Sequence, residues 1–285
     1  MNALTWLRDA IRLLRDAGIR FPEKEAEEIL KHAGIDPVTL YRDLPELKEP
    51  ELKELNNILQ RRANREPLQY ILGYTYFLDL KIKTKKGVLI PRPETELLAL
   101  EAIKKAQTGS RVTVLDLCTG SGCIAIAIGK AIKEAQVYGT DISEVAIRLA
   151  EENAELNNVK NVTFLKGDLF EPFKDSDIRF DIITANPPYI KSGDIPYLEP
   201  EVRDWEPHLA LDGGADGTEY YRRIFKESHQ YLKKGGALFL ELGEGLYKEL
   251  ISLAKLYMLK ESYVVKDFCG KERVLCLEIE ERRQP

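Results

Sequence analysis

Histidine, cysteine and long apolar runs are scarce in this sequence of 285 residues. The three histidines do not stand at the spacing of paired metal ligands, and the four cysteines, spaced C-x4-C and C-x6-C, match no zinc pattern. We therefore expect no metal site, and we interpret the cysteines as reduced thiols of the core. Apolar runs stay far below the length of a membrane span, and the first residues lack the apolar region of a secretory signal. These features predict a cytoplasmic protein that binds no membrane.

An excess of positive charge is also missing, since the net charge is −5. Residues 1–90 carry 16 Lys and Arg against 14 Asp and Glu, and the rest of the chain carries 26 against 33. A protein that grips nucleic acid through its phosphates usually presents a basic face. The charge therefore argues against a stable complex with nucleic acid.

The first part of the sequence has a helical pattern of apolar residues. Leu4, Leu7, Ile11 and Leu14 recur at helical spacing, and similar stretches follow between prolines and glycines up to about residue 65. Residues 1–68 are therefore predicted to form a small helical bundle, which shows no catalytic constellation. Residues 69–96 alternate polar and apolar side chains and predict a β-hairpin linker followed by a loop with the sequence PRPETE.

Residues 97–285 instead alternate apolar strands with helices, which is typical of a doubly wound, Rossmann-like and mostly parallel sheet. The last two strands are joined only by the short stretch CGKE, so this pair is predicted to be antiparallel. The seven expected strands span residues 112–117, 135–141, 162–168, 180–186, 236–242, 263–268 and 273–280.

A glycine-rich turn and two acids follow the first three of these strands. Such a turn lets a ligand approach the backbone closely. Asp141 lies 21 residues after Gly120, where an acid accepts hydrogen bonds from ribose hydroxyls, and Asp168 can accept one from an adenine amine. The strand ends therefore predict a nucleoside site, whose candidate residues are Asp116, Cys118, Thr119, Gly120, Ser121, Gly122, Asp141, Ile142, Asp168 and Leu169.

A nicotinamide cofactor is the natural rival ligand. However, the stretch DLCTGSG lacks the G-x-G-x-x-G spacing and places Asp116 at the start of the turn. A carboxylate there repels pyrophosphate but suits a ligand with an ammonium group and no phosphate. S-adenosylmethionine is such a ligand.

The fourth strand ends in the sequence Asn-Pro-Pro-Tyr, residues 186–189. Proline cannot donate to a sheet and restricts the residue before it, so the chain leaves the strand rigidly at Asn186. Together with the nucleoside site, this turn makes the sequence similar to class I S-adenosylmethionine-dependent methyltransferases. More narrowly, it resembles the HemK/PrmC family, protein glutamine N5-methyltransferases that modify peptide release factors. The matching stretches are PLQYILGYTYF (67–77), IPRPETELL (90–98), DLCTGSGCIAIAI (116–128), GTDIS (139–143), NPPYI (186–190) and EPHLALDGGADGTEYYRRI (206–224).

The resemblance implies methyl transfer from S-adenosylmethionine to the glutamine of a Gly-Gly-Gln loop. It implies that the side-chain oxygen of Asn186, which also borders the cofactor, and the carbonyl of Pro187 accept hydrogen bonds from the substrate amide, with Pro188 stiffening the turn and Tyr189 packing on the amide plane. Residues 1–68 would then select the release factor, and a monomer is expected. His208 stands where the family would have a proline or small residue. The implied gate over the pocket consists of Arg92, Glu94, Thr95 and Glu96.

Three alternatives stay open on the sequence. One is N5-glutamine methylation of a ribosomal protein, and another is methylation of an adenine amine in nucleic acid, where the same turn occurs. The third is a protein that binds S-adenosylmethionine without catalysis, which intact NPPY and PRPETE stretches disfavour.

Overall fold

The computed structural model describes residues 1–109 and 111–279, which fold into two compact units. The first unit comprises Met1–Gly73 together with the short segment Glu199–Trp205. The second comprises Tyr74–Leu198 and the residues from Glu206 onward. The sequence pattern did not indicate that residues 199–205 pack with the N-terminal helices.

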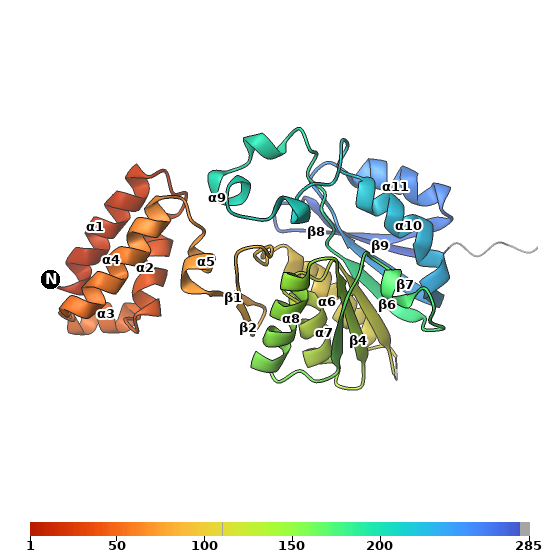
Figure 1. Ribbon diagram of the computed structural model, residues 1–285, viewed down its shortest axis with the longest axis horizontal. Coiled ribbons are helices and arrows are strands. Elements are labelled where there is room, and N and C mark those ends of the chain that lie inside the picture. The colour runs from red at the N-terminus through yellow and green to blue at the C-terminus, as the bar shows by residue number, and fades with distance from the viewer. Residues whose placement is uncertain (110, 280–285) are drawn as a thin grey trace, which may run out of the picture. The chain divides into compact units, whose positions relative to one another are not determined.

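The first unit is a bundle in which α1, α2 and α4 pack around one core (Figure 1). The apolar stripe of the sequence faces inward, so that Leu7 and Leu14 are buried, and the indole of Trp6 donates to Asn56 at 2.9 Å. The helical prediction for this region is confirmed. The helices are α1 (Ala3–Asp16), α2 (Pro22–His32), α3 (Pro37–Asp43), α4 (Glu49–Ala63) and α5 (Leu68–Leu72), with α9 (Pro200–Arg203) in the short segment.

Arginine side chains hold the short segment on this bundle. The Arg62 guanidinium, only 5% exposed, pairs with Glu25 and donates to Glu201 at 2.9 Å. Arg65 donates to the other carboxylate oxygen of Glu201 at 2.6 Å. Because one carboxylate is shared by two guanidinium groups, the segment and α4 are linked by charge-assisted hydrogen bonds.

The hairpin is shorter than the sequence predicted. Its strands are β1 (Tyr74–Phe77) and β2 (Leu80–Lys83), which pair antiparallel. Residues 68–72 form α5 instead, because Leu68 and Leu72 at helical spacing are both buried, and Gly73 ends the helix with a φ of +80°. The chain then runs without regular structure to Thr95.

The second unit contains the predicted seven-stranded sheet, in the order β5-β4-β3-β6-β7-β9-β8 (Figure 1). Its first five strands, from β5 to β7, are parallel to one another, whereas β9 is antiparallel to both β7 and β8, which confirms the prediction for the last pair. The last residue of the expected strand 273–280 lies outside the described residues. The strands are β3 (Thr113–Leu117), β4 (Gln136–Asp141), β5 (Val162–Lys166), β6 (Phe180–Ala185), β7 (Leu232–Glu241), β8 (Leu259–Lys266) and β9 (Glu272–Ile279).

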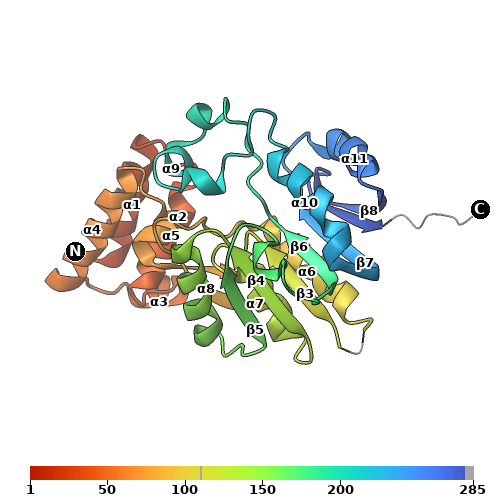
Figure 2. The ribbon, with the colours of Figure 1, turned by 45° about the vertical axis from the view of Figure 1, so that its right-hand side comes forward.

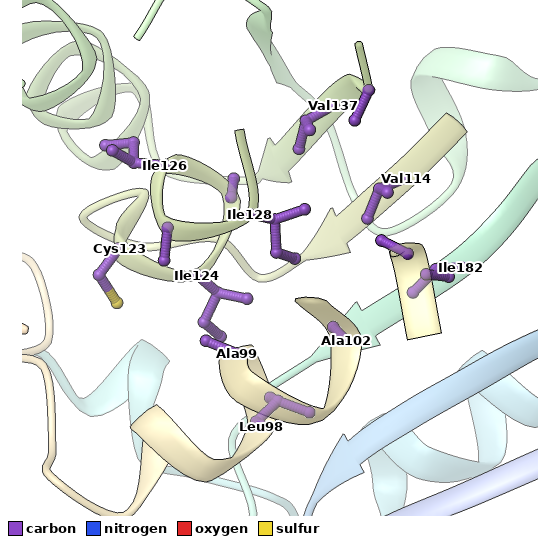
Figure 3. Packing of buried hydrophobic residues seen from close by; sticks show 14 of the residues in the cluster. Leu98, Ala99, Ala102, Val114, Cys123, Ile124, Ile126, Ile128, Val137 and Ile182 are labelled. Atoms are coloured by element: carbon purple, nitrogen blue, oxygen red, sulfur yellow. The ribbon is translucent and has the colours of Figure 1, made fainter. Parts of the chain in front are cut away.

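Helices cover both faces of this sheet (Figure 2). They are α6 (Thr95–Ala106), α7 (Cys123–Ala131), α8 (Glu144–Leu156), α10 (Glu219–Tyr231) and α11 (Tyr247–Leu256), with 3-10 turns at Glu171–Phe173, Ile195–Tyr197 and His208–Ala210. Val114 and Ile182 pack against α6 and α7 (Figure 3), while Leu115 and Ile183 belong to the cluster with α10 and α11. Because side chains alternate along a strand, neighbouring strand residues lie on opposite faces of the sheet. The residues that follow the strand ends are not covered by these helices in the same way and can form a ligand site.

None of the helices within residues 1–109 and 111–279 combines the length and the apolar character that a bilayer crossing requires.

Candidate active site

A pocket opens at the carboxyl ends of β3, β4, β5 and β6, where open α/β sheets bind ligands. It brings together most of the predicted residues: Cys118, Thr119, Gly120 and Ser121 after β3, Asp141 and Ile142 at the end of β4, Asp168 and Leu169 after β5, and Asn186 and Pro188 after β6. Further wall residues come from other segments and include Val88, Leu89, Arg92, Thr95, Ile124, Leu209, Tyr220 and Arg223.

The backbone is strained at two of these strand ends. Cys118 and Leu169 have φ values of +55° and +51°, a region that side chains other than glycine rarely adopt. Both residues line the pocket. Gly122 does not line it, but a Cβ atom there would lie 2.9 Å from the Ala150 Cβ, so only glycine allows the turn to pack on α8. Strain of this kind is typical of sites that bind a ligand against the backbone.

Asp141 is held at the centre of the turn. Its two carboxylate oxygens accept from the backbone N–H groups of Gly120 and Ser143, each at 2.9 Å. Burial raises the pKa of Asp141 above its ordinary value, although these two hydrogen bonds lower it. Each oxygen keeps a further lone pair, and the residue lines the pocket, so the carboxylate can accept from a pair of ligand hydroxyls.

Asp168 has a partner that the sequence did not indicate. Its Oδ2 accepts from the Arg223 guanidinium at 2.5 Å, and the same guanidinium lies 5.4 Å from the ring centre of Tyr220. Tyr220 and Arg223 stand three residues apart on α10, so both reach one wall of the pocket. This spacing within the stretch EYYRRI was the signal that could have revealed them.

Asp116 lies behind the turn and does not line the pocket. Its side chain is fully buried and accepts from the hydroxyls of Thr119 at 2.6 Å and Thr184 at 2.8 Å. Burial raises the pKa of this carboxyl to about 7, although these two hydroxyls and the Ala125 N–H lower it. The direct contact with a ligand that the sequence predicted is therefore replaced by a contact with Thr119, which does line the pocket.

The Asn-Pro-Pro-Tyr turn divides between the pocket and the core. Asn186 lines the pocket and donates from Nδ2 to the Thr95 Oγ1 at 3.2 Å. Pro188 also lines it, whereas Pro187 and Tyr189 do not. The Tyr189 hydroxyl instead donates to Glu241 at 3.4 Å, at the end of β7.

The stretch LDGGADG, residues 211–217, braces this turn. The Ile190 N–H donates to the Leu211 carbonyl, and the Gly213 N–H donates back to the Ile190 carbonyl. A Cβ atom at Gly213 would lie 2.7 Å from the Cα of Tyr189, and one at Gly217 would lie 2.5 Å from the Tyr189 carbonyl oxygen. These glycines are required because the two backbones touch.

The PRPETE loop contributes two of its four predicted residues to the pocket. Arg92 and Thr95 line it, whereas Glu94 is exposed and Glu96 accepts from the Leu78 N–H of the hairpin at 2.7 Å. A single nitrogen of Arg92, Nη2, donates to both oxygens of the buried Glu206 carboxylate, at 2.8 and 2.7 Å.

The departure at His208 is confined to a loop. His208 is exposed and is the first residue of a 3-10 turn. The residues on either side of His208, Pro207 and Leu209, line the pocket.

These side chains fit a nucleoside that carries no phosphate. Both guanidinium groups of the wall are paired with carboxylates, Arg92 with Glu206 and Arg223 with Asp168. Within the described part of the chain the wall therefore offers no unpaired cation to a phosphate. The acceptors at Asp141 and Asp168, the apolar side chains and the close backbone approach suit a neutral or positively charged nucleoside, as S-adenosylmethionine is.

Comparison with known proteins agrees with this geometry. The family model described as "Methyltransferase domain" matches residues 108–279, and that described as "PrmC N-terminal domain" matches residues 5–73. The release factor glutamine methyltransferase of Thermodesulfovibrio yellowstonii is 44% identical over 98% of both chains, and that of Geobacter sulfurreducens is 41% identical over 96% of this chain and 94% of its own.

Solved structures share the fold of the second unit. A ribosomal protein L11 methylase of Lactobacillus delbrueckii superposes with a TM-score of 0.50 and 23% identity, over 67% of this chain and 81% of that one. The T. thermophilus 16S rRNA N2 G1207 methyltransferase, solved with AdoMet and guanosine, gives a TM-score of 0.51 and 22% identity, over 73% of this chain and 50% of that one. At these identities they establish the fold alone. The full-length relatives go further, and by them the chain belongs to the family of release factor glutamine methyltransferases.

Proposed function

We propose that this protein transfers the methyl group of S-adenosylmethionine to the side-chain amide nitrogen, N5, of the glutamine in the Gly-Gly-Gln loop of peptide chain release factors. The observation that carries the proposal is the orientation of Asn186 in the pocket wall. Its NH2 group is already bonded to Thr95, so its carbonyl oxygen is the group left for a substrate. A substrate amide can donate to that oxygen.

S-adenosylmethionine supplies a methyl group on a positively charged sulfur, a good leaving group. We assign the ribose hydroxyls to Asp141 and the adenine amine to Asp168, with Ile142 and Leu169 against the base. Asp116 acts on the ammonium group through Thr119, because the Asp116 carboxylate holds the hydroxyl proton of Thr119 and leaves its oxygen as an acceptor. Arg92 and Thr95 border the methionine end and serve as the gate.

An amide nitrogen is a weak nucleophile because its lone pair is delocalised into the carbonyl. The Asn186 oxygen and the Pro187 carbonyl accept the two N–H bonds of the substrate amide, which favours the positive charge that develops at nitrogen during transfer. The Pro-Pro turn and the brace at residues 211–217 fix both acceptors before the substrate arrives. Once the methyl group is bound, the nitrogen loses one proton to solvent and the neutral methylamide remains.

The helical unit is proposed to select the release factor, as residues 1–68 were interpreted from the sequence. Val38, Tyr41 and Leu44 stand three residues apart along and just after α3, and all three are exposed apolar side chains. Such a stripe suits a protein partner better than water. We also propose that the enzyme acts in the cytoplasm as a monomer, where its substrate works in translation.

A methyl-transfer assay with labelled S-adenosylmethionine tests the proposal. Intact release factor should be labelled on the glutamine of its Gly-Gly-Gln loop, and a release factor with that glutamine replaced by alanine should not. Parallel arms offer a ribosomal protein mixture, duplex DNA and tRNA. Preferential labelling of any of these three would overturn the proposed substrate.

A further inference from the structure

A buried acid lies behind the Asn-Pro-Pro-Tyr turn and has no place in the transfer step described above. Glu241 is the last residue of β7 and is only 3% exposed. It does not line the pocket. Burying a carboxyl group costs folding free energy unless hydrogen bonds compensate for the lost water. Its contacts therefore indicate what it does.

Two hydroxyl groups of site residues act on the side-chain carboxyl of Glu241. Its Oε1 accepts from the Tyr189 hydroxyl at 3.4 Å, and the Thr95 hydroxyl lies close enough to the carboxyl to lower its pKa. The second oxygen, Oε2, has no hydrogen-bond partner among the residues that the structure describes. Thr95 is the first residue of α6, so the carboxyl group also lies at the positive end of that helix.

The link to Asn186 follows from the single proton of the Thr95 hydroxyl. When that proton is donated to Glu241, the Thr95 oxygen can only accept, and the group that it accepts from is Nδ2 of Asn186 at 3.2 Å. The amide of Asn186 is thereby held with its NH2 group toward Thr95. Its oxygen is then available to the substrate.

The ring of Tyr189 is fixed at two points. Its hydroxyl is bonded to Glu241, and its ring lies directly against Gly243, where a Cβ atom would be 2.8 Å from the ring carbon Cδ2. One carboxyl group thus contacts both the threonine that orients Asn186 and the aromatic ring of the same turn.

We propose that Glu241 is a positioning residue for methyl transfer, which acts through Thr95 to set the orientation of the Asn186 amide and directly to hold the ring of Tyr189. The proposal rests on the proposed function, in which the Asn186 oxygen receives the substrate amide. Glu241 touches neither the substrate nor the cofactor. Its effect is to keep the acceptor of the turn pointing in one direction.

The variant Glu241→Gln tests this with almost no change of shape. A glutamine amide can donate to Thr95, which frees the Thr95 proton for the Asn186 oxygen and takes that oxygen from the substrate. We expect kcat with release factor to fall by about 10²-fold, as for a misaligned reacting group. KM and the affinity for S-adenosylmethionine should change less than about threefold, because the interaction acts in the transition state.

Thr95 supplies the matched pair of variants. Thr95→Val keeps the shape but removes the hydroxyl and should lower kcat about as much as Glu241→Gln, while Thr95→Ser restores the hydroxyl and should recover most of the activity. Because both changes break one path, the double variant Glu241→Gln, Thr95→Val should be little worse than either alone. Glu244→Gln is the control. Glu244 is an exposed acid on the loop after β7 and forms an ion pair with Lys271. This variant should behave as the original protein.

Two results would overturn the proposal while leaving the proposed function intact. One is a kcat of Glu241→Gln within about threefold of the original in an assay where Asn186→Ala is strongly impaired. The other is full additivity of the Glu241 and Thr95 changes. If Asn186→Ala itself is unimpaired, the proposed function fails instead. Thermal unfolding and calorimetric binding of S-adenosylmethionine, measured on every variant, separate loss of positioning from loss of fold.

Discussion

The two units bury their charged groups in different ways. In the helical unit the buried guanidinium of Arg62 is matched by the carboxylates of Glu25 and Glu201. In the methyltransferase unit the buried carboxyls of Asp116 and Glu241 have hydroxyl groups as side-chain partners. In the helical unit, the ion pairs neutralise the buried charge and fix the contact between the short segment and the bundle. In the methyltransferase unit, the hydrogen bonds hold the hydroxyl groups in one orientation, but a carboxyl group is buried without an opposite charge.

The pKa shifts follow this difference. Burial would raise the pKa of Glu201, but its own backbone and the two arginines lower it below its ordinary value. Burial raises the pKa of Glu241 to about 7, and the hydroxyls of Thr95 and Tyr189 lower it only in part. Burying a carboxyl group without an ion-pair partner costs folding free energy. The two acids that carry this cost lie behind the pocket, and perturbed pKa values are common at functional sites.

Asn186→Ala should give the largest effect. The variant removes the oxygen that receives the substrate amide, so kcat should fall by about 10²–10³-fold, as when one preorganised donor or acceptor of a transition state is lost. Affinity for S-adenosylmethionine should change little. Steady-state kinetics with release factor and calorimetry with the cofactor measure the two effects. Near-normal turnover in both Asn186→Ala and Tyr189→Ala would reduce the turn to a structural role.

Asp141→Ala should affect binding where Asn186→Ala affects rate. The carboxylate both accepts from two backbone N–H groups and faces the pocket, so its removal should weaken binding of S-adenosylmethionine by about 1–3 kcal/mol. Asp141→Asn keeps the shape and should lose less. Calorimetry gives both affinities. Unchanged binding in the alanine variant would remove Asp141 from the cofactor site.

Much of this site could be predicted because its residues directly follow strands that the local sequence pattern reveals. The strand ends that carry Asp141, Asp168 and Asn186 follow directly from the alternation of strands and helices. What could not be predicted depends on distant contacts. Glu241 is a single acid at the end of an apolar strand, and nothing near it in the sequence says that Tyr189 and Thr95 will meet it.

The fold shows the same division. The sheet and its antiparallel pair followed from apolar periodicity and one short connection. The assignment of residues 199–205 to the helical unit depends on Glu201 meeting Arg62 and Arg65, more than 130 residues earlier in the chain. Residues 69–72 fall in the stretch whose alternation of polar and apolar side chains predicts a hairpin, but burial of Leu68 and Leu72 on one helical face makes them part of α5.

A smaller effect is expected in the pH dependence of stability. The folded pKa of Asp116, about 7, lies above its ordinary value of 3.8, so the folded state binds the proton more tightly. The stability that this group contributes is complete at pH values below its ordinary pKa and is lost as the pH rises through about 7. Between pH 5.5 and pH 7.5 the loss should be about 2 kcal/mol.

Asp116→Asn isolates that contribution, since an amide does not titrate. Denaturant unfolding across this pH range should show a steeper fall in the free energy of unfolding for the original protein than for the variant. Glu201 in the buried cluster around Arg62 should add no such slope, because its pKa lies below its ordinary value. Parallel curves for the two proteins would show that Asp116 is ionised throughout and that the contrast between the units is wrong.

The smallest effect should come from the surface of the helical unit. Tyr41 is exposed beside Val38 and Leu44, and none of the three serves the core of the bundle. If this stripe meets the release factor, Tyr41→Ala should raise KM by several-fold, about 1 kcal/mol for one aromatic contact, with kcat and cofactor affinity unchanged. Phe268→Ala is the matched control, an exposed aromatic of the methyltransferase unit, and should leave KM unchanged.

A short Gly-Gly-Gln peptide sharpens the test, because it reaches the pocket without the rest of the release factor. Tyr41→Ala should then methylate the peptide as fast as the original protein does. Equal KM values for intact release factor in the two proteins would show that this stripe does not select the substrate, and a slower reaction with the peptide would place the effect of Tyr41 on the catalytic unit instead.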